Sequence, residues 1–192
     1  MKKSKFLFSI LIICTLAACT VENDKTKVEV DAYFNLGALL NEKIEYLASA
    51  NAKLQKELTS QGASELLTID PDSVAGWKRQ FNLFYEADIN KLGYVGDYFE
   101  EEIPAINGIS KKIYSTKTQK NPVKVMEYIY EESSLKEIRI SVKESNAIYE
   151  VIKEMKLHFN KEEKLIGFDI TGGESMTVKE DLNYAIIGTI IY

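Results

Sequence analysis

The chain has 192 residues, a formal net charge of −5, one histidine and two cysteines. This acidic balance excludes nucleic acid as an expected partner, because a polyanion is repelled by a surface of the same sign. One histidine cannot build a metal site of several histidines, and the sequence contains no Walker loop, dinucleotide-binding fingerprint or G-x-S-x-G motif. We therefore expect no cofactor, no metal ligand and no identifiable catalytic residue.

The N-terminus has the three parts of an export signal. Three lysines among the first five residues precede an apolar run over 6–16, which is followed by small residues at 17 and 18. The run is too short for a membrane-spanning helix, which needs about 20 residues. We therefore predict a secretory signal peptide over residues 1–18.

Leu16-Ala17-Ala18-Cys19 resembles the lipobox of bacterial lipoproteins. The resemblance implies that Cys19 becomes a lipidated N-terminus, held to a membrane by its acyl chains. The residues after it, up to Val30, are polar and charged, so residues 19–30 are predicted to be the lipidated cysteine and a flexible tether. The expected location is the cell envelope at the outer membrane, on its periplasmic face or at the cell surface. Because Cys14 lies in the signal, no thiol would remain for a disulfide, a zinc-thiolate site or a nucleophile.

A long helix is predicted over about 31–61. Its apolar residues recur at helical spacing and include a series of one residue in seven, at Tyr33, Leu40, Leu47 and Leu54. Asp31 suits the N-cap and Gly62 suits the end of the helix. The apolar stripe fits either packing against the protein's own core or a coiled coil with a partner.

A second helix is predicted from Asp70-Pro71-Asp72 to about Lys91, because proline and acidic residues favour a helix N-terminus. One face of this helix is apolar and carries Val74, Trp77, Phe81, Phe84 and Tyr85. The face is interpreted as core packing or, alternatively, as one wall of a hydrophobic ligand pocket. Trp77 and Phe81 are the candidate binding residues for that pocket.

The end of the second helix offers a second pair of candidate ligand-binding residues, Asp88 and Asn90, next to the amine of Lys91. The alternative is that these side chains end the helix by bonding the backbone. Between residues 94 and 121 the pattern predicts loops around one short strand near 112–115. The acids at 97 and 100–102 are expected on a solvated surface.

From Pro122 the apolar pattern changes to a period of two, which indicates strands. Strands are expected at 123–131, 136–143, 148–159, 165–171 and 182–192, with a turn at Gly172-Gly173 and a possible helix over 147–154 instead of a strand. The fourth strand should bury Ile166, Phe168 and Ile170, the last strand should be central or covered, and His158 should be exposed. Residues 31–192 are thus predicted to form a single α+β domain, with two N-terminal helices packed on an antiparallel meander sheet of about five strands.

Trp77 with Phe81 and Phe84, the segment Glu86–Lys91 and the hairpin meander after it resemble a set of uncharacterised lipoproteins from Bacteroidota. In those proteins a tryptophan helix ending near D-I-N-K separates a long N-terminal helix from the sheet. The resemblance spans roughly residues 31–192. It implies this architecture and an envelope location, and it implies no activity.

The leading functional hypothesis is a membrane-anchored, non-enzymatic binding or interaction module for a protein, lipid or glycan partner. The alternative is a carboxylate-dependent hydrolase acting on envelope polymers. Such an enzyme needs two carboxyl groups about 5–9 Å apart in one cleft, one of them in an apolar setting. A structural role as a coiled coil is a third possibility.

Overall fold

The computed structural model describes residues 30–177 and 179–192. The predicted signal peptide, Cys19 and all of the predicted tether except its last residue lie outside these ranges. Within them, no helix is long and apolar enough to cross a membrane.

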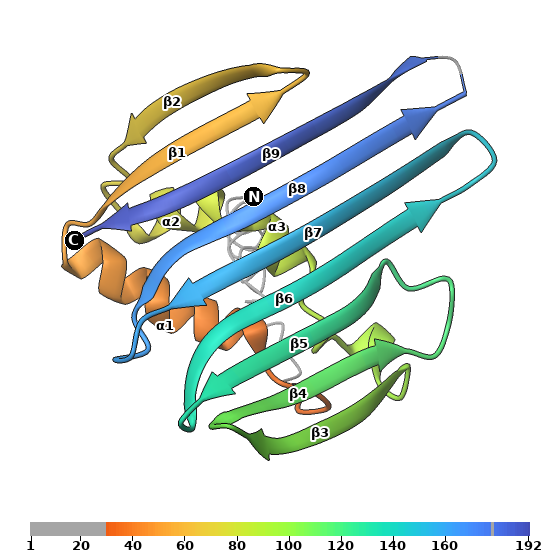
Figure 1. Cartoon of the computed structure of the whole chain (residues 1–192), viewed down its shortest axis with the longest axis horizontal. Helices are drawn as coiled ribbons and strands as arrows, with labels where there is room; N and C mark the ends of the chain where they lie inside the picture. The colour runs from red at the N-terminus through yellow and green to blue at the C-terminus, as the bar shows by residue number, and fades with distance from the viewer. Residues whose placement is uncertain (1–29, 178) are drawn as a thin grey trace, which may run out of the picture.

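Nine antiparallel strands form one open sheet in the described part of the chain (Figure 1). The strands are β1 Lys53–Ser60, β2 Ala63–Ile69, β3 Tyr98–Ile106, β4 Ile109–Thr116, β5 Val123–Glu131, β6 Ser134–Ser145, β7 Tyr149–Phe159, β8 Leu165–Met176 and β9 Lys179–Ile191. Their order is β2-β1-β9-β8-β7-β6-β5-β4-β3, so β3 to β9 form a meander and the first hairpin joins it at β9. The α+β class is confirmed, whereas five strands were too few.

Three short helices lie behind the sheet in the view of Figure 1. They are α1 Leu36–Ser49, α2 Val74–Gln80 and α3 Asn82–Glu86, and a 3₁₀ turn, η2 Leu92–Tyr94, follows them. The chain segment with α2, α3 and η2 connects β2 at one edge of the sheet to β3 at the other edge. The helices therefore cover one face of the sheet, called here the inner face.

The core lies between the helices and the inner face of the central strands. The α1 stripe of Leu36, Leu40, Ile44 and Leu47 is fully buried. It belongs to one buried cluster with Ile138 and Ile140 of β6, Leu157 of β7 and Phe168 of β8. The stripe therefore packs on the protein's own sheet, as the core interpretation of the first helix predicted.

The prediction of a helix as far as residue 61 is wrong. Helix α1 starts after Asn35, whose side chain accepts a hydrogen bond from the Ala38 amide at 2.8 Å, and it ends at Ser49. Asn51 takes a left-handed conformation with φ 50°, and β1 starts two residues later. Leu54 and Leu58 fitted the predicted helix because a spacing of four residues places two side chains on one face of a helix and equally on one face of a strand. Pairing with β9 makes the segment a strand.

The second predicted helix is shorter than expected and interrupted. Its N-cap is Ser73, whose hydroxyl accepts from the Gly76 amide at 3.1 Å, so the helix starts after Asp70-Pro71-Asp72. Phe81, with φ −101° and ψ 12°, separates α2 from α3, and α3 ends at Glu86. The apolar spacing continued across Phe81 because residues on both sides of the break face the same core.

The segment predicted as loops between 94 and 121 holds two strands, β3 and β4, joined by a turn at Asn107 and Gly108 with φ 54° and 81°. Pro104 argued against a strand at this position, because proline in a sheet is restricted to edge strands and bulges. β3 satisfies both conditions, since it is an edge strand and its register with β4 shifts between Ile103 and Ile106.

In the last three strands the predictions of a turn at Gly172-Gly173 and of a buried Ile166 are wrong, whereas a strand over 148–159 and a central last strand are confirmed. Residues 149–154 belong to β7 and are not helical, and Gly172-Gly173 lies inside β8 and makes no turn. Ile166 is 39% exposed, because the register shift beside Phe159 places it in a bulge. β9 is central, between β1 and β8, but its Ile187 is 48% exposed, so the strand is covered on one face only.

Candidate functional site

The face of the sheet opposite the helices, called here the open face, carries side chains in ordered rows. The direct register partners Glu127, Arg139, Lys156, Asp169 and Ile187 form one row across β5 to β9. The neighbouring row is Ile129, Glu137, His158, Gly167 and Thr189. The alternation predicted for residues 136–143 thus places its polar side chains together on this face.

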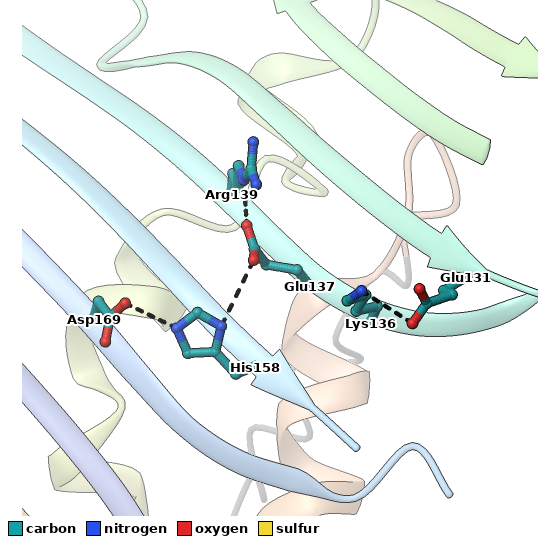
Figure 2. Close-up of polar contacts among 6 residues, drawn as sticks. All are labelled: Glu131, Lys136, Glu137, Arg139, His158 and Asp169. Carbon is teal, nitrogen blue, oxygen red and sulfur yellow. Dashed lines mark hydrogen bonds and ion pairs between the residues drawn. The ribbon is translucent and has the colours of Figure 1, made fainter. Parts of the chain in front are cut away.

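His158 lies at the centre of this arrangement (Figure 2). Its Nε2 is 2.9 Å from Oδ2 of Asp169 on β8, and its Nδ1 is 3.7 Å from Oε2 of Glu137 on β6. Glu137 also accepts a hydrogen bond from Arg139. Gly167, the direct partner of His158, has no side chain, which leaves room for the imidazole to reach Asp169 diagonally. We call Glu137, Arg139, Lys156, His158 and Asp169 the His158 cluster.

The charges of the His158 cluster are balanced and mutually oriented. Two carboxylates stand beside two permanent cations, and the hydrogen bond to Glu137 raises the pKa of the Arg139 guanidinium. The direct partners Lys156 and Asp169 carry opposite charges, which attract each other, whereas the direct partners Arg139 and Lys156 carry like charges. The carboxylates of Glu137 and Asp169 beside this pair offset its repulsion. The side chains remain accessible, with exposed fractions of 31% for His158, 37% for Asp169 and 17% for Glu137.

The described contacts of the cluster join its side chains to one another. The Ser141 hydroxyl donates a hydrogen bond to Glu154 at 2.7 Å, and this pair lies two register rows away from Glu137 and His158. Glu137 and Asp169 both approach the same histidine on an open surface, whereas a glycosidase pair faces a substrate across a cleft. Among the described residues, no group of three or more histidine, cysteine or acidic side chains is placed to hold a metal ion.

Trp77 and Phe81, the candidate pocket residues, are fully buried in the core. Their rings stack with centroids 6.1 Å apart, and Phe81 meets Phe168 of β8 edge-on at 5.3 Å. Phe84 also contacts Phe168, at 5.9 Å. Aromatic rings of the protein thus fill the space in which a hydrophobic ligand was considered, although the Trp77 indole N–H has no partner in the described structure.

Asp88 and Asn90 hold the segment that leads into α1. Asn90 Oδ1 accepts from the Ala32 and Tyr33 amides, both at 3.1 Å, and its Nδ2 donates to the Val30 carbonyl at 2.5 Å. Asp88 Oδ2 accepts from the Gly37 amide at 3.2 Å. We call residues 30–37 the entry segment. The structure brings these two candidates together, and it directs their polar atoms to backbone groups.

A surface hollow of about 460 Å³ lies beside the bulge of β3. Its lining includes Pro104, Ser110, Lys112 and Tyr130. The Lys112 ammonium is 2.7 Å from Glu100 and 3.5 Å from Glu102, and the hydrogen bond to Glu100 is the main cause that raises the pKa of Lys112. The acids at 100 and 102 thus pair with Lys112 across the β3–β4 hairpin, and Lys111 also lines the hollow.

Sequence reasoning missed the His158 cluster. The period-two pattern placed Glu137 and Arg139 on the polar face of one strand, and His158 and Lys156 on the polar face of a second strand. The predicted meander made the strands of His158 and Asp169 neighbours but did not give their register, so the contact between the two side chains could not be found.

Comparison with protein-family models, with curated proteins and with solved structures finds no match to this chain.

Proposed function

We propose that this chain is a lipid-anchored lipoprotein of the cell envelope and that its open sheet face binds a partner protein. The anchor is supported by the lysines, the apolar run and Leu16-Ala17-Ala18-Cys19 at the N-terminus. The binding role is supported by one observation above all. The described helices lie on the inner face, whereas the His158 cluster lies on the open face.

The chemistry of the open face favours a protein over the lipid and glycan alternatives. On β5 to β9 it combines paired charges with apolar side chains, such as Ile152 and Ile187, which are 41% and 48% exposed. Protein interfaces mix apolar and oriented charged groups in this way. Among the described residues, the registers place no phenylalanine, tyrosine or tryptophan ring on this part of the face for a sugar to stack on. A lipid chain would need an apolar cavity between the helices and the sheet, and the rings of Phe81 and Phe168 fill this space.

Replacing Cys19 by alanine is expected to move the protein out of the membrane fraction and to change its mobility on a gel. Each buried CH₂ of an acyl chain contributes about 0.8 kcal/mol, and two or more chains anchor a protein stably. Fractionation of cells expressing the full chain measures this. Cys14→Ala, which removes the other thiol, is the matched control and should stay with the membrane. If the Cys19→Ala variant keeps its gel mobility and stays in the membrane fraction, the proposed lipid anchor is wrong.

A photoreactive side chain at Thr171 is expected to form an adduct of defined mass with another protein in intact cells. Thr171 is exposed and lies on the open face beside the cluster, as the direct partner of Glu154. Adding Lys156→Glu should reduce the adduct at least about fivefold. The substitution places a negative charge beside Asp169 and reverses the sign of the charge that the partner protein would contact at this position. Lys161→Glu, on an exposed turn, is the charge-matched control.

The same probe at Glu45, an exposed position on α1, serves as the control for the inner side. Equal adducts from Glu45 and Thr171 would contradict a binding role of the open face. So would an adduct that Lys156→Glu leaves unchanged.

A further inference from the structure

β2 is a free edge of the sheet. Among residues 30–177 and 179–192 it pairs with β1 alone, and each of its residues except Ile69 is exposed. Leu66 is 62% exposed and Leu67 is 41% exposed. An edge strand presents unpaired N–H and C=O groups that can pair with another chain.

The opposite edge, β3, is protected against such pairing. It carries Glu100, Glu101 and Glu102 and then Pro104, and its register with β4 shifts at this point. Charges, proline and bulges are the devices by which proteins block edge pairing. β2, with the sequence Ala-Ser-Glu-Leu-Leu-Thr-Ile, has a single charge, no proline and an unbroken register. Only one of the two edges is therefore open to a further strand.

The turn of the β1–β2 hairpin determines which backbone groups of β2 point outward. Gln61 and Gly62, with φ 49° and 84°, form a two-residue loop of the type that joins tight hairpins. In such a hairpin the flanking pair, here Ser60 and Ala63, is hydrogen-bonded, and bonded pairs then alternate along the ladder. The N–H and C=O groups of Ser64, Leu66 and Thr68 consequently point away from β1.

We propose that β2 pairs antiparallel with β2 of a second copy of this chain, around a two-fold axis at Leu66. This register places Leu66 opposite Leu66 of the second copy, and Ser64 opposite Thr68 of the second copy. Every outward N–H of the two β2 strands can then donate a hydrogen bond to a carbonyl of the other strand. On the inner side, Glu65 faces Leu67 of the other copy. The edge is thus complementary to itself, as an isologous interface requires.

Neighbouring registers are less favourable. An axis at Glu65 would place two carboxylates directly opposite each other, and like charges at such positions are destabilising. An axis at Leu67 would use the outward groups of Leu66 and Thr68 and leave those of Ser64 unpaired. The chain therefore favours the axis at Leu66.

The two-fold axis is perpendicular to the sheet, so the helices of both copies lie on one side and both open faces lie on the other. Val30, which is bonded to Asn90 in the segment after α3, marks where the described chain begins in each copy. The two copies of Val30 thus lie in equivalent positions about an axis normal to the sheet, which is compatible with two anchors in one membrane. The pairing itself does not depend on lipidation or on a partner of the open face.

Cysteine cross-linking of the full-length protein in intact cells tests this pairing. In a hydrogen-bonded antiparallel pair the Cα atoms are about 5.5 Å apart, within the range that a disulfide spans. Leu66→Cys is expected to give at least about ten times more disulfide-linked dimer than Leu92→Cys. Leu92 is the matched control because it is 69% exposed and lies outside the sheet. Glu65→Cys and Leu67→Cys should link less than Leu66→Cys.

Leu66→Pro provides a second measurement by removing the outward N–H, which the β1 ladder does not use. We expect it to weaken dimerisation at least about tenfold, measured by sedimentation of the full chain in detergent, because two interchain hydrogen bonds are lost. Leu66→Ala keeps the N–H and should remain dimeric.

Equal cross-linking of Leu66→Cys and Leu92→Cys would overturn the proposal, as would a Leu66→Cys adduct only with a different protein. A folded Leu66→Pro variant that sediments as a dimer like the unmodified chain would also overturn it. If Leu66→Pro does not fold, the cysteine series decides alone.

Discussion

Replacement of Phe81 by alanine is expected to lower the free energy of unfolding by about 3–5 kcal/mol, the usual cost of truncating a buried phenylalanine. Phe81 is fully buried and contacts Trp77, Phe84 and Phe168, so its removal leaves a cavity between the helices and the sheet. Denaturant unfolding followed by circular dichroism measures the change.

Phe99→Ala is the matched control for this variant. Phe99 is also a phenylalanine in the folded domain, but it is 62% exposed and lies on β3 at the sheet edge. Its truncation should cost less than about 1 kcal/mol, including the contact with the Lys117 ammonium 4.9 Å from its ring. Similar losses for both variants would mean that Phe81 is not a core residue, and its role as a pocket wall would have to be reconsidered.

Replacement of Asn90 by alanine is expected to lower the free energy of unfolding by about 2–3 kcal/mol. The side chain makes three hydrogen bonds to the backbone at Val30, Ala32 and Tyr33, and each contributes about 1 kcal/mol net. The loss should be concentrated in the entry segment. Hydrogen exchange should therefore accelerate at the Ala32 and Tyr33 amides more than in the central strands.

Asn82→Ala is the control for the asparagine variant. The Asn82 amide bonds Glu86 within α3 on the exposed surface, so its loss should change stability by less than about 0.5 kcal/mol. If Asn90→Ala leaves the exchange of the entry segment unchanged, Asn90 is not what holds this segment. A ligand-binding role for Asn90 would then become relevant again.

The candidate sites and the fold are connected through this segment. Tyr33, in the entry segment, donates its hydroxyl hydrogen to the Tyr94 carbonyl at 2.9 Å and accepts from the Tyr98 amide at 3.1 Å. Tyr98 also donates to the Val123 carbonyl at 3.0 Å. The segment that would follow a lipid tether is thus bonded to β3 and, through Tyr98, to β5. This arrangement would hold the domain rigidly at the end of its tether and leave the open face accessible.

The sequence by itself determined features that depend on local periodicity. The β-branched and aromatic residues from 123 to 131 predicted a strand with the bounds of β5, and the helical spacing of Leu40 and Leu47 correctly indicated a buried face. Such patterns are informative because side chains repeat every two residues in a strand and every 3.6 in a helix, whatever lies nearby. The α+β class followed from the same patterns.

Only the tertiary structure decided the register of the strands and the contacts between segments that are far apart in the chain. Leu54 and Leu58 fitted both periods, and pairing with β9, more than a hundred residues later in the chain, made β1 a strand. Asp88 and Asn90 looked like a binding pair until their partners proved to be backbone groups 51 to 60 residues earlier. Likewise, the contact of His158 with Asp169 needs β7 beside β8 in one register. A periodic pattern specifies the face on which a side chain lies, whereas its neighbours depend on strand order and register across the whole sheet.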